Sequence, residues 1–355
     1  MDKINVCVLF GGVSPEHDIS LRSAETVLNN IDTDKYHVFA VGITKKGEWI
    51  CYREARWSDL PTHAWEEAES NRKAIVSPTH DGVLLVFSDT GVETVHIDVL
   101  YPVLHGENGE DGSIQGLAQL ANIPCVGPDL CASAVSMDKA VTKIVAKHLG
   151  VPQADWYVLN KHEYAENADF HIGRIEAQLA YPMFVKPAGT GSSVGVSKAT
   201  DRSALVKALM DAGKFDEKIL VEEFIHGREI EVAVMGNEEP VASVCGEIDS
   251  GADFYDYDAK YVTDTSTAYI PARIPADVQE QIRKEAVRVY KAIGCRGLSR
   301  VDFFATYAEN RVVFNEINTL PGFTSISMYP KLFAASGVSY TQLIDNLLNL
   351  AMEAF

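Results

Sequence analysis

The sequence predicts a fold of mixed α/β and α+β class, in which an open α/β domain is followed by two further domains. Strand and helix signals alternate through the first 127 residues, as in an open sheet whose strands are mostly parallel. The remaining residues contain longer runs of strand signals with fewer helices between them. The domains that we expect from these changes are 1–127, 128–225 and 226–355.

The N-terminal domain places two loops where a ligand can bind. The loop at 11–16 follows the first strand, and the loop at 105–112 follows the last one. Ligands of open α/β sheets gather beyond the carboxyl ends of the strands, so we expect a binding site at these loops. The elements expected here are strands at 4–10, 36–43 and 97–105 and helices at 19–31 and 113–121.

The rest of the chain is punctuated by glycines. Gly150 and Gly294 each follow a helical pattern directly, as C′ caps do. A long polar loop spans 249–267. The expected helices are 131–149, 202–212, 276–293 and 340–352, and the expected strands are 156–159, 183–186, 194–198, 218–224, 228–235 and 241–248.

The composition limits the classes of partner. The chain has 355 residues, of which 46% are hydrophobic, and a formal net charge of −19. This charge argues against nucleic acid or an anionic membrane, because both require a basic face. The six cysteines are scattered without a C-x-x-C pair, which is typical of reduced thiols in a cytosolic protein. With neither a secretory leader nor a run of membrane-spanning length, we expect a soluble cytoplasmic protein.

A hairpin near the C-terminus carries a candidate metal site. Apolar-rich runs at 298–305 and 312–318 flank a polar segment, which predicts an antiparallel pair. Asp302 would then face Glu316 with Cβ atoms roughly 5 Å apart, and Asn318 would share their face. Facing carboxylates repel unless a cation lies between them, and carboxylate and amide oxygens suit Mg²⁺. A solvated acidic hairpin is the alternative, but the neighbouring amides, hydroxyls and glycine turn favour a metal.

A loop of glycines and hydroxyls lies between the expected strands at 183–186 and 194–198. Glycines allow close approach to an anion, and consecutive N–H groups can cradle phosphate oxygens. The loop is neither a Walker A loop nor a dinucleotide fingerprint, because a strand rather than a helix follows it. A tight structural hairpin is the alternative. Lys186, which ends the first strand, favours phosphate binding.

Taken together, segments along the whole chain resemble the ATP-grasp superfamily and specifically the D-alanine–D-alanine ligases. The resemblance implies a pre-ATP-grasp domain at the N-terminus and a two-domain ATP-grasp fold after it. The segments that carry it are GGVSPEHDISLRSA at 11–24, HGENGEDGSIQG at 105–116, SMDKAVTK at 136–143, VKPAGTGSSVGVSK at 185–198, FYDYDAKY at 254–261, LSRVDFF at 298–304 and NEINTLPGFTSISMYPKL at 315–332.

The resemblance also implies an ATP site and a metal site. Two Mg²⁺ ions, or Mn²⁺ in their place, would bind to Asp302, Glu316 and Asn318. Lys139 and Lys186 would hold the phosphates of ATP. The ATP-binding residues implied in this way are Lys139, Lys186, Ser193, Glu222, Glu223, Phe224, Ile225, Glu229 and Phe304.

The implied reaction joins two D-alanines into D-alanyl-D-alanine through an acyl phosphate, as a step toward peptidoglycan. The acyl phosphate would hydrolyse in water, so a lid is needed, and the polar loop at 249–267 is the candidate. Glu16 would grip the ammonium of the first D-alanine within a hydrogen-bonded group that includes Ser192 and Tyr261. Arg300 and the Gly322 N–H would stabilise the oxyanion of the tetrahedral intermediate. The implied catalytic residues are Glu16, Ser192, Tyr261, Arg300, Gly322 and Ser327, and the implied substrate-binding residues are His105, Lys260 and Met328.

The residues alone leave other readings open. Glu16 stands at a helix start, where it would also complement the helix dipole. His105 on its own is more often a loop or core histidine, and Glu223 a solvated strand residue. Tyr255 and Tyr257 compete by composition with Tyr261.

Three other activities compete with this one. They are a ligase forming D-alanyl-D-serine, one forming D-alanyl-D-lactate, and a regulatory protein that binds ATP without turnover. Members of the family that this chain resembles are typically homodimers, so we expect a homodimer.

Overall fold

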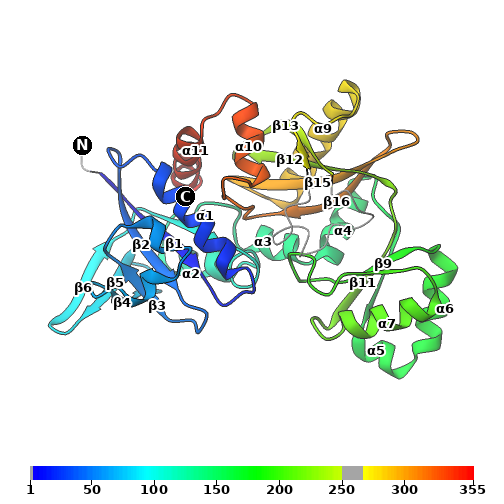
Figure 1. Ribbon diagram of the computed structural model, residues 1–355, viewed down its shortest axis with the longest axis horizontal. Coiled ribbons are helices and arrows are strands. Elements are labelled where there is room, and N and C mark those ends of the chain that lie inside the picture. Colours follow the sequence, from blue (N-terminus) through cyan, green and yellow to red (C-terminus); the bar gives the residue numbers. More distant parts are fainter. Residues whose placement is uncertain (1–2, 250–266) are drawn as a thin grey trace.

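The protein is built on three sheets that occupy successive parts of the chain (Figure 1). The computed structural model describes residues 3–249 and 267–355. In the view of Figure 1 the N-terminal sheet lies at the left, the second sheet at the lower right and the C-terminal sheet above it. The predicted class, α/β with α+β, is confirmed.

The first sheet has seven strands in the order β6-β5-β4-β3-β2-β1-β7. Helix α1 covers one face of it together with α11 from the C-terminus, and α2 packs on the other face. The elements are β1 (Ile4–Gly11), α1 (His17–Asn30), β2 (Tyr36–Ile43), β3 (Trp49–Tyr52), β4 (Arg72–Val76), β5 (Val83–Ser88), β6 (Gly91–His96), β7 (Val99–Leu104) and α2 (Ser113–Ala121), with short 3₁₀ turns at Trp57–Asp59 and Ala64–Glu67.

The prediction that this sheet is mostly parallel is wrong. Only β1–β2 and β1–β7 are parallel, whereas the pairs from β2 through to β6 are all antiparallel. Several of these strands are joined by short turns, such as the one from Ser88 to Gly91, and short connections require antiparallel neighbours. The parallel part, β2-β1-β7, is the part that ends at the two loops predicted to bind a ligand.

The second sheet has the strand order β10-β9-β11-β8, with α6 and α7 buried against it. The predicted helix at 131–149 is two helices, because Asp138 ends one and caps the next by accepting from Ala140 and Val141 N–H. The elements are α3 (Leu130–Met137), α4 (Lys139–His148), β8 (Trp156–Asn160), α5 (Lys161–Glu166), α6 (Ala168–Gln178), β9 (Met183–Pro187), β10 (Ser197–Ala199), α7 (Arg202–Ala212) and β11 (Lys218–Glu223).

The third sheet, in the order β14-β13-β12-β15-β16, contains the predicted hairpin as β15 and β16. Helix α9 packs on one face of it. The elements are β12 (Gly227–Met235), β13 (Val241–Asp249), β14 (Thr267–Tyr269), α9 (Ala276–Ile293), β15 (Leu298–Thr306), β16 (Val312–Asn318), α10 (Met328–Ala335) and α11 (Tyr340–Glu353).

One hydrophobic core joins the two ends of the chain. Leu21 of α1 and Leu343 and Leu347 of α11 belong to the same buried cluster, and the two helices lie side by side in Figure 1. The Tyr36 hydroxyl adds a hydrogen bond of 2.7 Å to Asp345. This packing fixes the loop between β16 and α10 against the N-terminal sheet. The described residues contain no helix that is both long and apolar enough to cross a membrane.

Candidate active site

A cavity of about 800 Å³ is lined by residues from all three sheets. Every described candidate residue named from the sequence lines it except Asp302, which accepts hydrogen bonds from two lining residues, Arg300 and Asn318. Tyr261 and Lys260 lie outside the described residues, as do Tyr255, Tyr257 and the body of the expected lid. Residues that are far apart in the sequence therefore meet in one place.

Lys139 connects the glycine loop to the metal hairpin. It is the first residue of α4, and its Nζ donates to the Thr190 carbonyl at 2.7 Å. The same ammonium lies 3.7 Å from the Glu316 carboxylate. A cation held between an anion-binding loop and a carboxylate is suited to a phosphate group.

Glu222 is fully buried at the back of the cavity between two lysines. Its carboxylate forms ion pairs with both Lys143 and Lys186. Burial alone would raise the pKa of Glu222, but the two ammonium groups outweigh burial and hold that pKa at about 2. Glu222 is therefore an anion that orients Lys186, and its side chain is already engaged by the protein.

An apolar region lies next to these lysines. The Phe184 and Phe224 rings are 5.8 Å apart, and Lys198 Nζ lies 4.2 Å from the centre of the Phe224 ring. Glu229 is directly opposite Phe304 across the β12–β15 pair. Flat apolar walls with a carboxylate at one edge suit an aromatic base attached to a sugar.

Three carboxylates form a row across adjacent strands of the third sheet. Glu231 on β12 is opposite Asp302 on β15, and Asp302 is opposite Glu316 on β16, as predicted. Arg300 compensates part of this charge: it donates to both oxygens of Asp302 at 2.8 and 2.7 Å and lies 3.2 Å from Glu231. Burial would lower the pKa of Arg300, but these carboxylates raise it well above its ordinary value.

Two cations that lie against the row, Arg300 and Lys139, are protein side chains, which the sequence argument for a cation between the carboxylates had not foreseen. Glu316 and Asn318 line the cavity. The Asn318 amide nitrogen donates to Asp302 at 3.0 Å, so the amide oxygen of Asn318 points away from Asp302. This donor set fits a hard divalent ion.

Glu16 lies at the other side of the cavity, as the N-cap residue of α1. Its side chain makes no capping hydrogen bond to the helix, and its carboxylate instead accepts a hydrogen bond from the Ser192 hydroxyl. Ser192 and Ser193 are both in the left-handed region, with φ of 49° and 58°. This turn of the glycine loop presents Ser192 to α1. Glu16 therefore faces the cavity and the glycine loop while it also stands at the N-terminus of α1.

His105 is buried, and both of its ring nitrogens bond to the protein. Nδ1 lies 3.1 Å from the Leu320 carbonyl, and Nε2 lies 3.0 Å from the Ser23 hydroxyl. Burial lowers the pKa of His105, so the ring is neutral, with Nδ1–H donating and Nε2 accepting. Ser23 also accepts from the Phe323 N–H at 3.2 Å. His105 therefore fixes the loop around Gly322 and has no nitrogen left for a substrate.

The loop after β16 leads into α10 at the cavity wall. Ser327 is the N-cap of α10, and its hydroxyl lies 2.8 Å from that of Thr324. An added Cβ at Gly322 would lie 2.7 Å from the Ser327 hydroxyl, so only glycine fits there without displacement. Met328 begins the helix and is buried. The N-terminus of α10 thus faces the cavity as an anion site.

Four cavity or near-cavity residues were missed from the sequence. Lys143 lies one helical turn after Lys139, and Glu231 lies two positions after Glu229 on the same strand face, so spacing could have found both. Glu110 is within the quoted loop 105–112 and accepts from the Gly106 N–H at 3.0 Å. Lys331 lines the cavity from α10, and no sequence signal distinguishes it.

Comparison with known proteins gives similarity along nearly the whole chain. The family described as D-ala D-ala ligase N-terminus matches residues 5–128, and the one described as D-ala D-ala ligase C-terminus matches 145–349. The D-alanine–D-alanine ligase of Caldicellulosiruptor bescii is 47% identical, covering 99% of this chain and 96% of the relative. That of Ruminiclostridium cellulolyticum is 49% identical, covering 100% and 97%.

Solved structures show the same likeness. The VanG D-Ala:D-Ser ligase of Enterococcus faecalis superposes with a TM-score of 0.90 at 37% identity, covering 99% of this chain and all of the other. The D-alanine–D-alanine ligase of Coxiella burnetii gives a TM-score of 0.85 at 34% identity, covering 100% and 95%.

Proposed function

The chain belongs to the D-alanine–D-alanine ligase family, and we propose a role for each of its site residues in the ligation of two D-alanines. The reaction is ATP-dependent and ADP-forming, and it yields D-alanyl-D-alanine for peptidoglycan synthesis. The observation that carries the proposal is the single cavity in which phosphate-binding lysines, a carboxylate row and the Glu16–Ser192 pair face one another.

ATP occupies the side of the cavity formed by the second sheet and the hairpin. Its phosphates bind to Lys139 and Lys186, and to Ser193 of the glycine loop between β9 and β10. The base lies against the apolar wall and meets the backbone of 222–225, because the Glu222 side chain is engaged by lysines. Glu229 binds the ribose hydroxyls, beside Phe304.

A divalent metal is part of the family's reaction, and Mg²⁺ is the ion that we propose here, with Mn²⁺ as a substitute. Asp302, Glu316 and Asn318 would hold it, and bound there it would neutralise charge on the phosphates. Arg300 and Lys139 reduce the repulsion between the carboxylates of the row, both before and after the ion binds.

The amino acids occupy the opposite side. Glu16, held by Ser192, binds the ammonium of the first D-alanine, whose carboxylate attacks the γ-phosphorus of ATP to give an acyl phosphate and ADP. The amine of the second D-alanine then attacks the acyl carbon. Arg300 and the Gly322 N–H stabilise the oxyanion, and phosphate leaves. Ser327 and the start of α10 receive the carboxylate of the second D-alanine.

His105 takes part as a positioning residue in this scheme. Its two hydrogen bonds hold the strand-to-helix loop that contains Gly322 against α1. We further propose domains at 1–127, 128–225 and 226–355, a homodimer and a cytoplasmic location.

The test is ADP release by the purified protein with Mg²⁺ and ATP, together with identification of the product. D-alanine should give D-alanyl-D-alanine, whereas L-alanine and D-lactate should give little release. Release of ADP that does not depend on any D-amino acid would overturn the proposal, and ATP binding without turnover would favour a regulatory protein.

A second candidate is a D-alanyl-D-serine ligase. It is favoured by the TM-score of 0.90 to the VanG ligase, which exceeds the 0.85 to the Coxiella burnetii enzyme. The relatives at 46–49% identity are, however, D-alanine–D-alanine ligases. Equal concentrations of D-alanine and D-serine distinguish the two, since the ratio of dipeptides reports the preference for the second substrate.

A further inference from the structure

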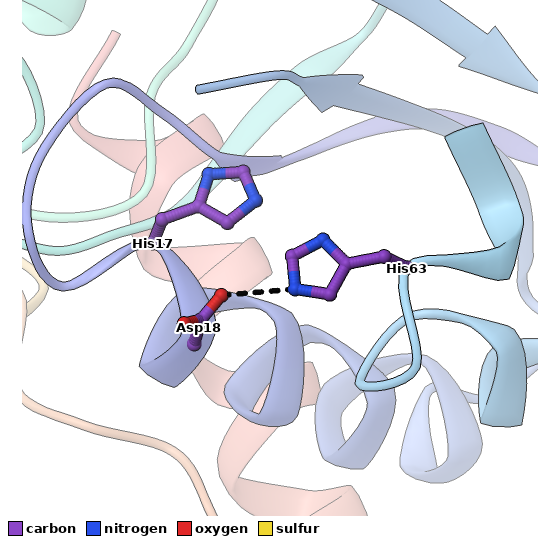
Figure 2. Close-up of side chains that lie close together, drawn as sticks. All are labelled: His17, Asp18 and His63. Atoms are coloured by element: carbon purple, nitrogen blue, oxygen red, sulfur yellow. Dashed lines mark hydrogen bonds and ion pairs between the residues drawn. The ribbon is translucent and has the colours of Figure 1, made fainter.

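Three side chains with metal-binding atoms meet just outside the cavity. His17 and Asp18 come from the first turn of α1, and His63 comes from the turn before the second 3₁₀ segment (Figure 2). One ligand atom from each lies within 4.8 Å of the others, and this is the one such group of histidine, cysteine and acidic residues within 3–249 and 267–355. None of the three has a part in the proposed ligation.

His17 supplies a nitrogen that the protein leaves without a partner. Its side chain is fully buried, and Nδ1 lies 2.6 Å from the Gly12 carbonyl, to which it donates. That bond places the lone pair on Nε2. In the described structure Nε2 is buried and has no hydrogen-bond partner, and Figure 2 shows it directed toward His63. An orphaned ring nitrogen of this kind is costly unless it has a ligand.

His63 has a carboxylate at each ring nitrogen. Nδ1 lies 3.0 Å from Glu66 Oε1, and Nε2 lies 3.0 Å from Asp18 Oδ1. A neutral imidazole carries one N–H and can donate to only one of them. When Nδ1–H donates to Glu66, Nε2 presents a lone pair to the Asp18 carboxylate. A cation bound between them makes this contact favourable, as would a second proton on the ring, which would turn Nε2 into a donor.

We propose that His17 Nε2, His63 Nε2 and the Asp18 carboxylate bind a divalent transition-metal ion of the zinc class. Two imidazoles and a carboxylate, with water as the fourth ligand, are a usual set for such ions. Bonds of about 2.1 Å at tetrahedral angles bring ligand atoms to about 3.4 Å from one another. The pair His63 Nε2 and Asp18 Oδ1, now 3.0 Å apart, must therefore separate slightly, which rotation of the exposed Asp18 and half-exposed His63 permits.

In the structure the Asp18 carboxylate forms an ion pair with Lys45, and this ammonium group would compete with a metal ion. Lys45 Nζ lies 3.1 Å from Oδ1 and 3.2 Å from Oδ2, and its side chain is exposed. It can therefore move into solvent when the metal binds. Metal bound here would join the first turn of α1 to the segment around His63, and so would hold the helix end on which Glu16 lies.

The experiment titrates the purified, metal-free full chain with Co²⁺, without ATP or Mg²⁺, and follows the visible absorption of the ion and the thermal midpoint. One ion should bind per chain, displaceable by Zn²⁺, and raise the midpoint. His63→Ala and Asp18→Asn should each weaken binding roughly tenfold or more. Lys45→Ala should strengthen it, because it removes the competing cation.

The matched control is His96→Ala. His96 Nε2 lies 3.5 Å from Asp98 but belongs to no group of three metal-binding side chains in the described part of the chain, so its loss should leave Co²⁺ binding unchanged. His17→Ala is a further variant, whose fold is checked by circular dichroism because His17 is buried. Absence of Co²⁺ binding, or binding equally strong in His63→Ala and Asp18→Asn, would overturn the proposal.

Discussion

The Ser192 hydroxyl donates a hydrogen bond to the Glu16 carboxylate across 176 residues of sequence. The bond joins the glycine loop of the second sheet to the first turn of α1 on the N-terminal sheet. It therefore fixes the distance between the two sides of the cavity that we propose for the phosphates and for the amino acids. A carboxylate oriented in this way is prepared to receive an ammonium group without further ordering.

Ser192→Ala should reduce kcat/KM for D-alanine by roughly 10- to 100-fold, because Glu16 loses the donor that orients it. The thermal midpoint should change by no more than about 2 °C, since the bond lies in a loop. Steady-state kinetics and a melting curve make the comparison. Ser203→Ala, at an exposed position of α7, is the control and should be indistinguishable from wild type. Unchanged kinetics in Ser192→Ala would remove this bond from the mechanism.

Glu316→Gln should lower kcat by roughly 100-fold or more, because it removes one charge of the proposed metal site. The fold should persist, since Glu316 is at the cavity edge and not in a core. The measurement is D-alanine-dependent ADP release over a range of Mg²⁺ concentrations. Glu309→Gln makes the same chemical change in the exposed turn of the same hairpin and should have no effect. Near-normal turnover of Glu316→Gln at ordinary Mg²⁺ would show that the metal assignment is wrong.

Glu222→Gln should destabilise the protein by about 3–5 kcal/mol, because Lys143 and Lys186 would be left as neighbouring buried cations. Chemical denaturation measures this loss. Adding Lys143→Met to Glu222→Gln should recover part of it, as a coupled pair requires. Glu223→Gln, the next residue on β11, should cost far less, because its carboxylate accepts from the Asp155 N–H at 3.3 Å and forms no ion pair within the described residues. Equal losses of stability in Glu222→Gln and Glu223→Gln would contradict the argument that Glu222 compensates the charges of Lys143 and Lys186.

The hairpin and its facing carboxylates could be predicted from the sequence because strand alternation determines them locally. Asp302 and Glu316 are in register as expected, although a β-bulge follows Asp302. Helices with a clear helical pattern were also predictable, and 113–121, 202–212 and 276–293 are found at those residues. The strands between 49 and 96 were not predicted, because their apolar runs are short and pair only through tertiary structure.

Contacts between distant segments could not be predicted from spacing. The sequence placed His105 near the amino-acid sites, but only the fold brings Ser23 and Leu320 to its two nitrogens. Likewise, Arg300 and Lys139 were each assigned a substrate contact, and their ion pairs with the carboxylate row appear only when three strands and α4 are assembled. Local patterns thus indicate which residues matter, and packing decides what each one contacts.

Glu110 provides a prediction that depends on pH. Burial, and then the nearby Glu16 carboxylate, raises the pKa of Glu110 to about 8. In an unfolded chain a glutamate titrates at about 4.3. Between these values the folded protein binds a proton that the unfolded chain does not. The free energy of unfolding must therefore fall as the pH rises through this window, and the loss is complete above about pH 8.

Glu110→Gln cannot lose that proton, so its free energy of unfolding should lack this decline. The free energy of unfolding of the variant minus that of wild type should rise by up to about 1.4 kcal/mol per pH unit between roughly pH 5 and 8, and then level off. Chemical denaturation at half-unit steps of pH measures the difference. Glu107→Gln, at an exposed position of the same loop, is the control and should give a flat difference. A flat difference for Glu110→Gln as well would mean that Glu110 is ionised at neutral pH, in which case two carboxylates rather than one would face the substrate ammonium.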